Sequence, residues 1–180
     1  MKTWITSDLH FGHENVLKFC PETRGCFNDA EHMNNEIVRI WNDVVADEDL
    51  IYILGDVAFM SGYNAAQVVK RLKGRKVLIE GNHDPKLLKD VHFRNCFEEI
   101  HKYHEIRYNK TNVVMFHYPI AEWNRMHYGA VHFYGHLHGS PSGLEKYRAR
   151  DMGFDATGNV VTLMDAAIED AKKGEIKGHH

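Results

Sequence analysis

The chain has 180 residues, of which 43% are hydrophobic and 26% are charged, the balance of a folded domain rather than of a disordered or membrane-embedded chain. The formal net charge of −3 argues against a protein that holds extended nucleic acid on a basic face. It does not exclude a nucleotide or a short strand held through metal ions. We expect one domain over residues 1–180, with a sizeable core.

Cysteine usage and the first residues bear on the compartment. The cysteines are Cys20, Cys26 and Cys96. Their odd number and lack of Cys-x-x-Cys spacing predict free thiols in a reducing compartment. The chain opens without a secretory signal pattern, and no apolar run approaches the roughly 20 residues of a membrane span. We therefore expect a cytoplasmic protein that does not bind a membrane. His179 and His180, either native or a tag remnant, receive no role.

The apolar pattern predicts alternating strands and helices in the first half of the chain. A strand over residues 2–7 comes first, and a helix begins after the N-cap Asp29. Apolar residues recur in this helix at helical spacing and predict one buried face. They are Met33, Ile37, Ile40, Trp41 and Val44. A buried strand over 50–54, an amphipathic helix over 65–72 and a second buried strand over 76–80 follow.

The second half is dominated by strands. We predict them over residues 113–116, 131–134 and 160–163, followed by a helix over 164–173. This order predicts an α/β fold with mixed sheets. Polar motifs follow the apolar runs, so they should gather at the carboxyl ends of neighbouring strands, where open α/β sheets bind their ligands.

Five polar motifs each follow a strand-like run. They are Asp8-Leu9-His10, Gly55-Asp56, Gly81-Asn82-His83-Asp84, His117 and Gly135-His136-Leu137-His138. Residues two apart in extended backbone face the same side, so Asp8 and His10 can ligate one ion. The imidazoles of His136 and His138 likewise lie on one face, a spacing typical of metal sites. The Asp56 carboxylate can bridge two ions because it has two oxygens. Most of these residues, taken singly, are also explained as turn residues; their joint presence indicates a metal site.

The order of the motifs resembles that of the calcineurin-like metallophosphoesterase superfamily. The chain is most similar to the small single-domain bacterial and phage phosphoesterases of that group. The shared segments are Asp8 to Asn15, Trp41-Asn42, Tyr134 to Gly139 and Asp151 to Asp155. The resemblance implies a four-layer α/β/β/α sandwich with two mixed β-sheets.

The resemblance also implies a centre with two divalent metal ions. One ion would be held by Asp8, His10 and His138, the other by Asn82, His117 and His136, with Asp56 bridging both. The set contains no sulfur, which argues against a structural zinc–thiolate site. A mixed nitrogen and oxygen set suits Mn²⁺, Fe²⁺, Co²⁺, Ni²⁺ or Zn²⁺, and similar enzymes are often activated by manganese.

The implied mechanism uses a metal-bridging hydroxide, because metal ions lower the pKa of bound water to about 7. His83 would protonate the leaving oxygen as general acid, and Asp84 is the candidate to support it. One departure concerns Phe59, which stands where the phosphoprotein phosphatases of the superfamily carry a supporting Asp. A phosphoprotein phosphatase is therefore disfavoured.

Four residues are candidate substrate contacts. His13 and Asn15 follow the first metal strand, although a turn and a helix cap explain them equally well. Arg24 and Arg125 are candidate contacts to a phosphate or a base, although surface arginines are common. Asp151 and Asp155 are expected to stabilise loops rather than bind metal.

We interpret the chain as a binuclear metal-dependent phosphoesterase acting on small molecules or nucleotides. It would hydrolyse phosphodiester or phosphomonoester bonds, with diesters favoured because no arginine cluster for a dianion is evident. One alternative is a nuclease acting on DNA or RNA, against which the acidic net charge counts. The other is an inactive scaffold that binds a protein, against which the retained His83 and ligand set count. The oligomeric state is not predicted.

Overall fold

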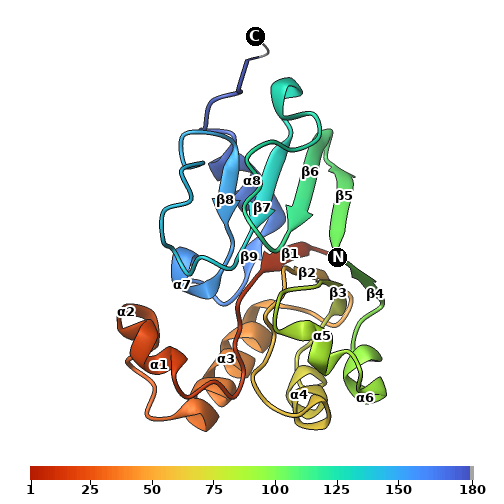
Figure 1. Cartoon of the computed structure of the whole chain (residues 1–180). Helices are drawn as coiled ribbons and strands as arrows, with labels where there is room; N and C mark the ends of the chain where they lie inside the picture. The colour runs from red at the N-terminus through yellow and green to blue at the C-terminus, as the bar shows by residue number, and fades with distance from the viewer. Residues whose placement is uncertain (179–180) are drawn as a thin grey trace.

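The computed structural model describes residues 1–178, so His179 and His180 lie outside the described residues. Within this range the chain forms two β-sheets (Figure 1). The first sheet has the strand order β4-β3-β2-β1-β9, with β1 (Thr3–Thr6), β2 (Leu50–Ile53), β3 (Arg75–Ile79), β4 (Glu99–His101) and β9 (Thr162–Leu163). The second has the order β5-β6-β7-β8, with β5 (Tyr103–Tyr108), β6 (Thr111–Phe116), β7 (Val131–Tyr134) and β8 (Ala149–Asp151).

Both sheets are mixed. Strands β1 to β4 pair in parallel, and β9 joins β1 in the antiparallel sense. Strands β6, β7 and β8 pair in parallel, whereas β5 and β6 form an antiparallel hairpin. The predicted α/β class with two mixed sheets is confirmed. In each sheet the parallel strands bring their carboxyl ends to one edge, and the polar motifs follow these ends.

Most helices are short. They are α1 (Val16–Phe19), α2 (Pro21–Arg24), α3 (Ala30–Val44), α4 (Gly62–Val69), α5 (Asp84–Leu87), α6 (Val91–Arg94), α7 (Phe154–Thr157), α8 (Met164–Ala171) and the 3₁₀ helix η1 (Met126–Tyr128). Helix α3 begins where predicted, because the Asp29 side chain accepts a hydrogen bond from the His32 N–H. Val44, expected on the buried face, is 47% exposed. The helix ends there, and Val45 is buried in its place.

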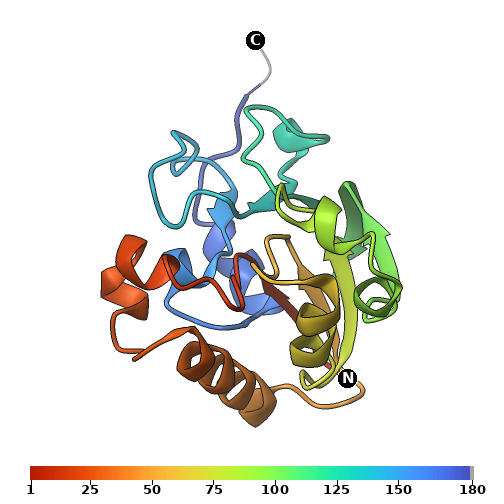
Figure 2. The same ribbon diagram turned by 60° about the horizontal axis from the view of Figure 1, so that its bottom comes forward.

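Successive side chains along a strand point to opposite faces of its sheet, and this alternation decides which hydrophobic core each one joins. On β6, Val113 and Met115 face the core between the sheets, whereas Val114 faces outward. Helices α3 and α4 cover the other face of the first sheet, as Figure 2 shows, and α8 adds Met164 and Ile168 to the core between the sheets. The outer face of the second sheet is covered by η1 and loops, with Trp123 in that small core. No helix within residues 1–178 has the length and apolar character needed to cross a membrane.

Candidate metal centre

The predicted ligands lie in tight turns just beyond the strands rather than in extended backbone. Five of them have positive φ: Asp8 (55°), His10 (53°), Asp56 (53°), His136 (72°) and His138 (49°). Residues other than glycine rarely adopt this conformation, and where several do so together the surrounding structure must enforce it. The expectation that these pairs share a face because their backbone is extended is therefore wrong. Left-handed turns direct them inward instead.

The first ligand group consists of Asp8, His10 and His138, whose ligand atoms all lie within 4.8 Å of one another. Asp8 Oδ1 is 3.7 Å from His10 Nε2 and 3.9 Å from His138 Nε2, too far for hydrogen bonds. Asp8 Oδ1 and His10 Nε2 are buried and have no hydrogen-bond partner within residues 1–178. Buried polar atoms are almost always satisfied, so two such atoms facing each other fit a shared cation.

A second layer of contacts fixes the first group. His138 Nδ1 lies 2.6 Å from Asp155 Oδ2, which leaves Nε2 directed at Asp8. Burial alone would raise the pKa of Asp155, but hydrogen bonds from His138 and Arg24 hold it well below its usual value. The expected loop role of Asp155 thus extends to orienting a predicted ligand.

Arg24 does not face substrate, contrary to expectation. Its side chain is 0% exposed and forms an ion pair with Asp155, with Nε 2.8 Å from Oδ1. It also donates to the backbone carbonyls of Asp8, at 2.6 Å, and Leu9, at 2.9 Å. The guanidinium thus ties the turn that carries Asp8 and His10 to Asp155. A buried arginine of this kind is a positioning residue.

His13 contacts the first group through His10. Their Nδ1 atoms lie 3.1 Å apart, so one ring donates to the other. Burial, and next the neighbouring His10, lower the pKa of His13 to about 4, so the ring is neutral and can accept the proton of His10 Nδ1. His10 Nε2 is then left with a lone pair directed at Asp8. Asn15 is exposed, and its side chain makes no capping bond to α1, so the helix-cap alternative for this residue is not supported.

The second ligand group consists of Asp56, His117 and His136, joined by Asn82. His117 Nδ1 donates to the Leu54 carbonyl at 2.7 Å, which leaves a lone pair on Nε2. That atom faces Asn82 Oδ1 at 2.9 Å and Asp56 Oδ2 at 3.6 Å, and both oxygens are also acceptors. Three acceptors directed at one another require a shared cation or proton.

Asp56 lies between the two groups. Its Oδ2 is 4.0 Å from His10 Nε2 and 3.6 Å from His117 Nε2, while Oδ1 accepts the His83 N–H at 3.0 Å. The expectation from the sequence is one carboxylate oxygen for each ion. The geometry directs Oδ2 alone to both groups, because Oδ1 is held by the backbone.

Asp84 is fully buried, and its carboxylate is occupied by backbone. It accepts N–H groups from Asp56 (2.9 Å), Val57 (3.0 Å) and Gly81 (2.8 Å). Burial raises the pKa of this carboxyl in spite of these bonds. Within the described residues no hydrogen bond joins its side chain to the His83 ring, so these contacts do not show the expected support of His83. Asp84 instead clamps together the loops that carry Asp56 and His83.

Gly55 and Gly81 allow these two loops to touch. Gly55 has a φ of +92°, and a Cβ there would lie 2.4 Å from the Gly81 nitrogen. A Cβ on Gly81 would lie 2.4 Å from Asp56 Oδ1. Any side chain at either position would therefore separate the loops or displace Asp56.

His83 sits beside the bridging carboxylate and is open to solvent. Its Nε2 lies 3.8 Å from Asp56 Oδ2, and its side chain is 44% exposed. Its ring packs on Phe59 at a centroid distance of 4.2 Å, and Phe59 also stacks on His13 at 3.9 Å. The rings of His83 and Phe59 line a hollow of about 400 Å³, together with Ala58, Met60, Lys86 and Leu87. The sequence marks Phe59 only as a departure from the phosphoprotein phosphatases, and no local signal predicts its packing against His83.

Arg125 is not brought to either ligand group. It is exposed and precedes η1 on the loop that crosses the outer face of the second sheet, where its neighbour Asn124 donates to Glu105. The neighbouring Trp123 is buried and donates to the Ala130 carbonyl. The expected contact between Arg125 and substrate therefore finds no support in the geometry.

The chain belongs to the calcineurin-like phosphoesterase family, whose model matches residues 1–173. An uncharacterised protein of Methanocaldococcus jannaschii is 27% identical, over 97% of this chain and 94% of that protein. The gene 66 protein of Mycobacterium phage L5 is 30% identical, over 89% of each chain. A solved structure of a protein of unknown function from Aquifex aeolicus superimposes with a TM-score of 0.65 and 26% identity, covering 86% of this chain and 90% of that one. The protein is therefore a metal-dependent phosphoesterase by family, and so a hydrolase.

Proposed function

We propose that the protein uses two divalent metal ions to hydrolyse phosphodiester bonds of small molecules or nucleotides, with His83 as general acid. The observation that carries this proposal is the position of Asp56 Oδ2, 4.0 Å from His10 in the first ligand group and 3.6 Å from His117 in the second. One oxygen facing ligand atoms of both groups supports a bridged pair of ions. Membership of the phosphoesterase family supports the reaction class.

The chain's own residues suit this chemistry. Two bound ions, with Mn²⁺ the first candidate, would activate water near neutral pH and stabilise charge on the phosphoryl oxygens. Asp8 and Asp56 offset half of the charge of two divalent ions, so the centre stays attractive to an anionic phosphoryl group. His83 lies next to Asp56 Oδ2 with one face open to the hollow, where it can give a proton to a leaving oxygen. The Phe59 ring packs against the His83 ring, with centroids 4.2 Å apart.

The cations near the hollow favour a diester over a monoester. A monoester dianion carries more charge and gains more from additional cationic side chains. Arg24 is buried against Asp155, and Arg125 lies on the outer loop of the second sheet. Within the described residues, Lys86 is the lysine or arginine that lines the hollow beside His83. A single cationic side chain suits the single negative charge of a diester better than the dianion of a monoester.

The test compares bis-p-nitrophenyl phosphate with p-nitrophenyl phosphate, using chelator-treated protein with and without added Mn²⁺. We expect metal-dependent hydrolysis that is faster on the diester and falls to background in Asp56→Asn. Asp47→Asn, which changes an exposed carboxylate of the same kind, should retain full activity. Faster hydrolysis of the monoester would overturn the substrate class, and full activity in Asp56→Asn would overturn the bridging role.

A further inference from the structure

A second set of metal-binding side chains lies outside the centre described above. It consists of Glu99 and His101 on β4 and His104 on β5. One ligand atom from each of the three lies within 4.8 Å of the other two. None of these residues is used by the proposed mechanism.

The register of the strands explains why these side chains meet. In the first sheet Glu99 pairs with Val77 and His101 with Ile79, and both apolar partners belong to the core between the sheets. Neighbouring residues in register share a face, so Glu99 and His101 are directed toward the same space. Strand β4 is at the edge of its sheet, where that space opens to solvent.

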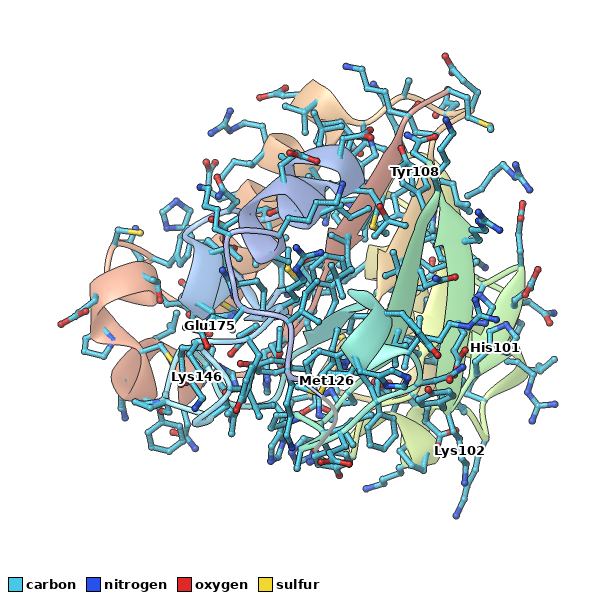
Figure 3. The ribbon with its side chains drawn as sticks, turned by 90° about the horizontal axis from the view of Figure 1, so that it is seen from above. His101, Lys102, Tyr108, Met126, Lys146 and Glu175 are labelled. Atoms are coloured by element: carbon cyan, nitrogen blue, oxygen red, sulfur yellow. The ribbon has the colours of Figure 1, made fainter. Side chains whose placement is uncertain are left out.

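The third side chain comes from the other sheet. Only Lys102 separates β4 from β5, so the chain passes here from the edge of one sheet to the edge of the other. Ile106 on β5 packs against the core between the sheets, and His104, two residues earlier, shares its face. Figure 3 shows His101 and Lys102 at one end of this region and Tyr108 at the other end of β5. The three side chains thus face one another across the open edge of the sandwich.

The contacts within the cluster suit a cation. His101 Nε2 lies 2.7 Å from Glu99 Oε2, and the rings of His101 and His104 stack with centroids 4.1 Å apart. The side chain of Glu99 is 60% exposed and that of His101 is 32% exposed, so an ion can reach them from solvent. Burial lowers the pKa of His104, which keeps a lone pair free near neutral pH.

We propose that Glu99, His101 and His104 form a third cation site, which binds a transition-metal ion such as Zn²⁺ and joins β4 of the first sheet to β5 of the second. Two imidazoles and a carboxylate suit Zn²⁺, Ni²⁺, Co²⁺ or Cu²⁺, whereas Mg²⁺ and Ca²⁺ prefer oxygen ligands alone. His101 would ligate through Nε2 as the tautomer that carries its proton on Nδ1. Three protein ligands leave a further position for water.

The proposed third site lies on strands that neighbour those of the candidate metal centre, and it shares no ligand with that centre. Strand β4 pairs with β3, which leads to Asn82, and β5 pairs with β6, which leads to His117. A bound ion would thus tie together the strands that flank the second ligand group. Since the site does not rest on the proposed phosphoesterase mechanism, the two proposals fail independently.

The test counts bound zinc by elemental analysis after equilibrium dialysis of chelator-treated protein against low micromolar Zn²⁺. All samples carry His179→Ala and His180→Ala, so that the terminal histidines do not contribute. We expect His104→Ala and Glu99→Gln each to bind one zinc fewer per chain than this background. His92→Ala, which removes an exposed histidine on α6, should bind as many as the background.

A second readout follows thermal unfolding. Zn²⁺ should raise the melting temperature of the background protein more than that of Glu99→Gln, because only the former gains the link between sheets. Glu99 is exposed and Gln has its shape, so this variant keeps the fold even if His104→Ala does not. Equal zinc counts in the background and Glu99→Gln, with equal shifts in melting temperature, would overturn the proposal.

Discussion

The two ligand groups of the candidate centre differ in how firmly the protein holds them. In the first, protein contacts orient every side chain: Asp155 holds His138, His13 contacts His10, and the His136 N–H donates to Asp8 Oδ2 at 2.9 Å. In the second, the Leu54 carbonyl orients His117. Within residues 1–178 the His136 side chain makes no hydrogen bond and only packs against the rings of His117 and Tyr118.

This difference bears on affinity. A ligand set that is already oriented loses little freedom when an ion binds, whereas an exposed Asn82 and an unrestrained His136 must be ordered by the ion itself. We therefore expect the first group to bind its ion more tightly, and the second ion to be the exchangeable one. The metal concentration needed for activity would then report on the second group.

The first prediction concerns His83, which is a ligand in neither group, so its loss should lower the rate and leave both ions bound. His83→Ala should lower kcat on a diester by about 10²–10⁴-fold, the usual contribution of a general acid, without changing the number of bound metal ions. Steady-state kinetics with elemental analysis of the same samples would measure this. The matched control is His92→Ala, and a loss of metal together with activity in His83→Ala would contradict the assigned role.

Asp84→Asn should break the clamp beneath the second group. The amide would direct an N–H₂ toward backbone N–H donors that the carboxylate now satisfies in a fully buried position. We expect the free energy of unfolding to fall by about 3 kcal/mol, because buried donors are left without acceptors. Urea denaturation of metal-free protein measures this, with the exposed Asp47→Asn as control. An unchanged free energy would show that the loops do not depend on Asp84.

Asp155→Asn should weaken the first group selectively. It removes the charge that orients His138 and pairs with Arg24, and loss of such a partner typically costs 10–100-fold in metal affinity. Metal retention during titration with a competing chelator would detect this, with Asp165→Asn on α8 as the control. We expect the variant to weaken the more tightly bound of the two ions. If it weakened the less tightly bound ion, the first group would be the weaker site, and the ranking of the two groups would be reversed.

His132 provides a buried imidazole that is not a ligand. Its Nδ1 pairs with the Val114 carbonyl and its Nε2 accepts the Ile120 N–H, so unlike His10 it leaves no atom unpaired. Burial lowers its pKa from 6.5 to about 4. Between these values the unfolded chain binds a proton that the folded chain does not, so stability falls as the pH is lowered.

At pH 5 this difference costs the folded state about 2 kcal/mol relative to pH 7. His132→Gln should therefore lose less stability than wild type between pH 7 and pH 5, whatever its stability at pH 7. Urea denaturation of metal-free protein at the two pH values gives the comparison. Equal losses in the two proteins would show that His132 does not contribute to acid sensitivity.

Local patterns in the sequence were sufficient to predict much of the fold. Strand β7 has the predicted bounds, and α3 begins after Asp29, because apolar runs and caps are local signals. Strands β4 and β5 were missed, because residues 99–108 mix polar and apolar side chains at the edges of both sheets. Strand β4 pairs with β3, which lies on the far side of α5 and α6 in the chain, whereas β5 pairs with the adjacent β6 in a hairpin.

The site was predictable in its residues but not in its conformation. The prediction that residues at strand ends lie together is correct for Asp8, His10 and His138. The left-handed backbone that directs these side chains inward has no local sequence signal. The burial of Arg24 depends on Asp155, which is 131 residues away in the chain. No single segment shows that a charged residue has such a partner, so the sequence alone makes Arg24 a candidate contact to substrate.

Anomalous diffraction from crystals grown with Mn²⁺ tests the bridged pair of ions most directly. We expect two peaks, one beside Asp8 Oδ1 and His10 Nε2 and one beside His117 Nε2, with Asp56 Oδ2 in contact with both ions. A single peak, or two ions that do not share Asp56, would contradict it.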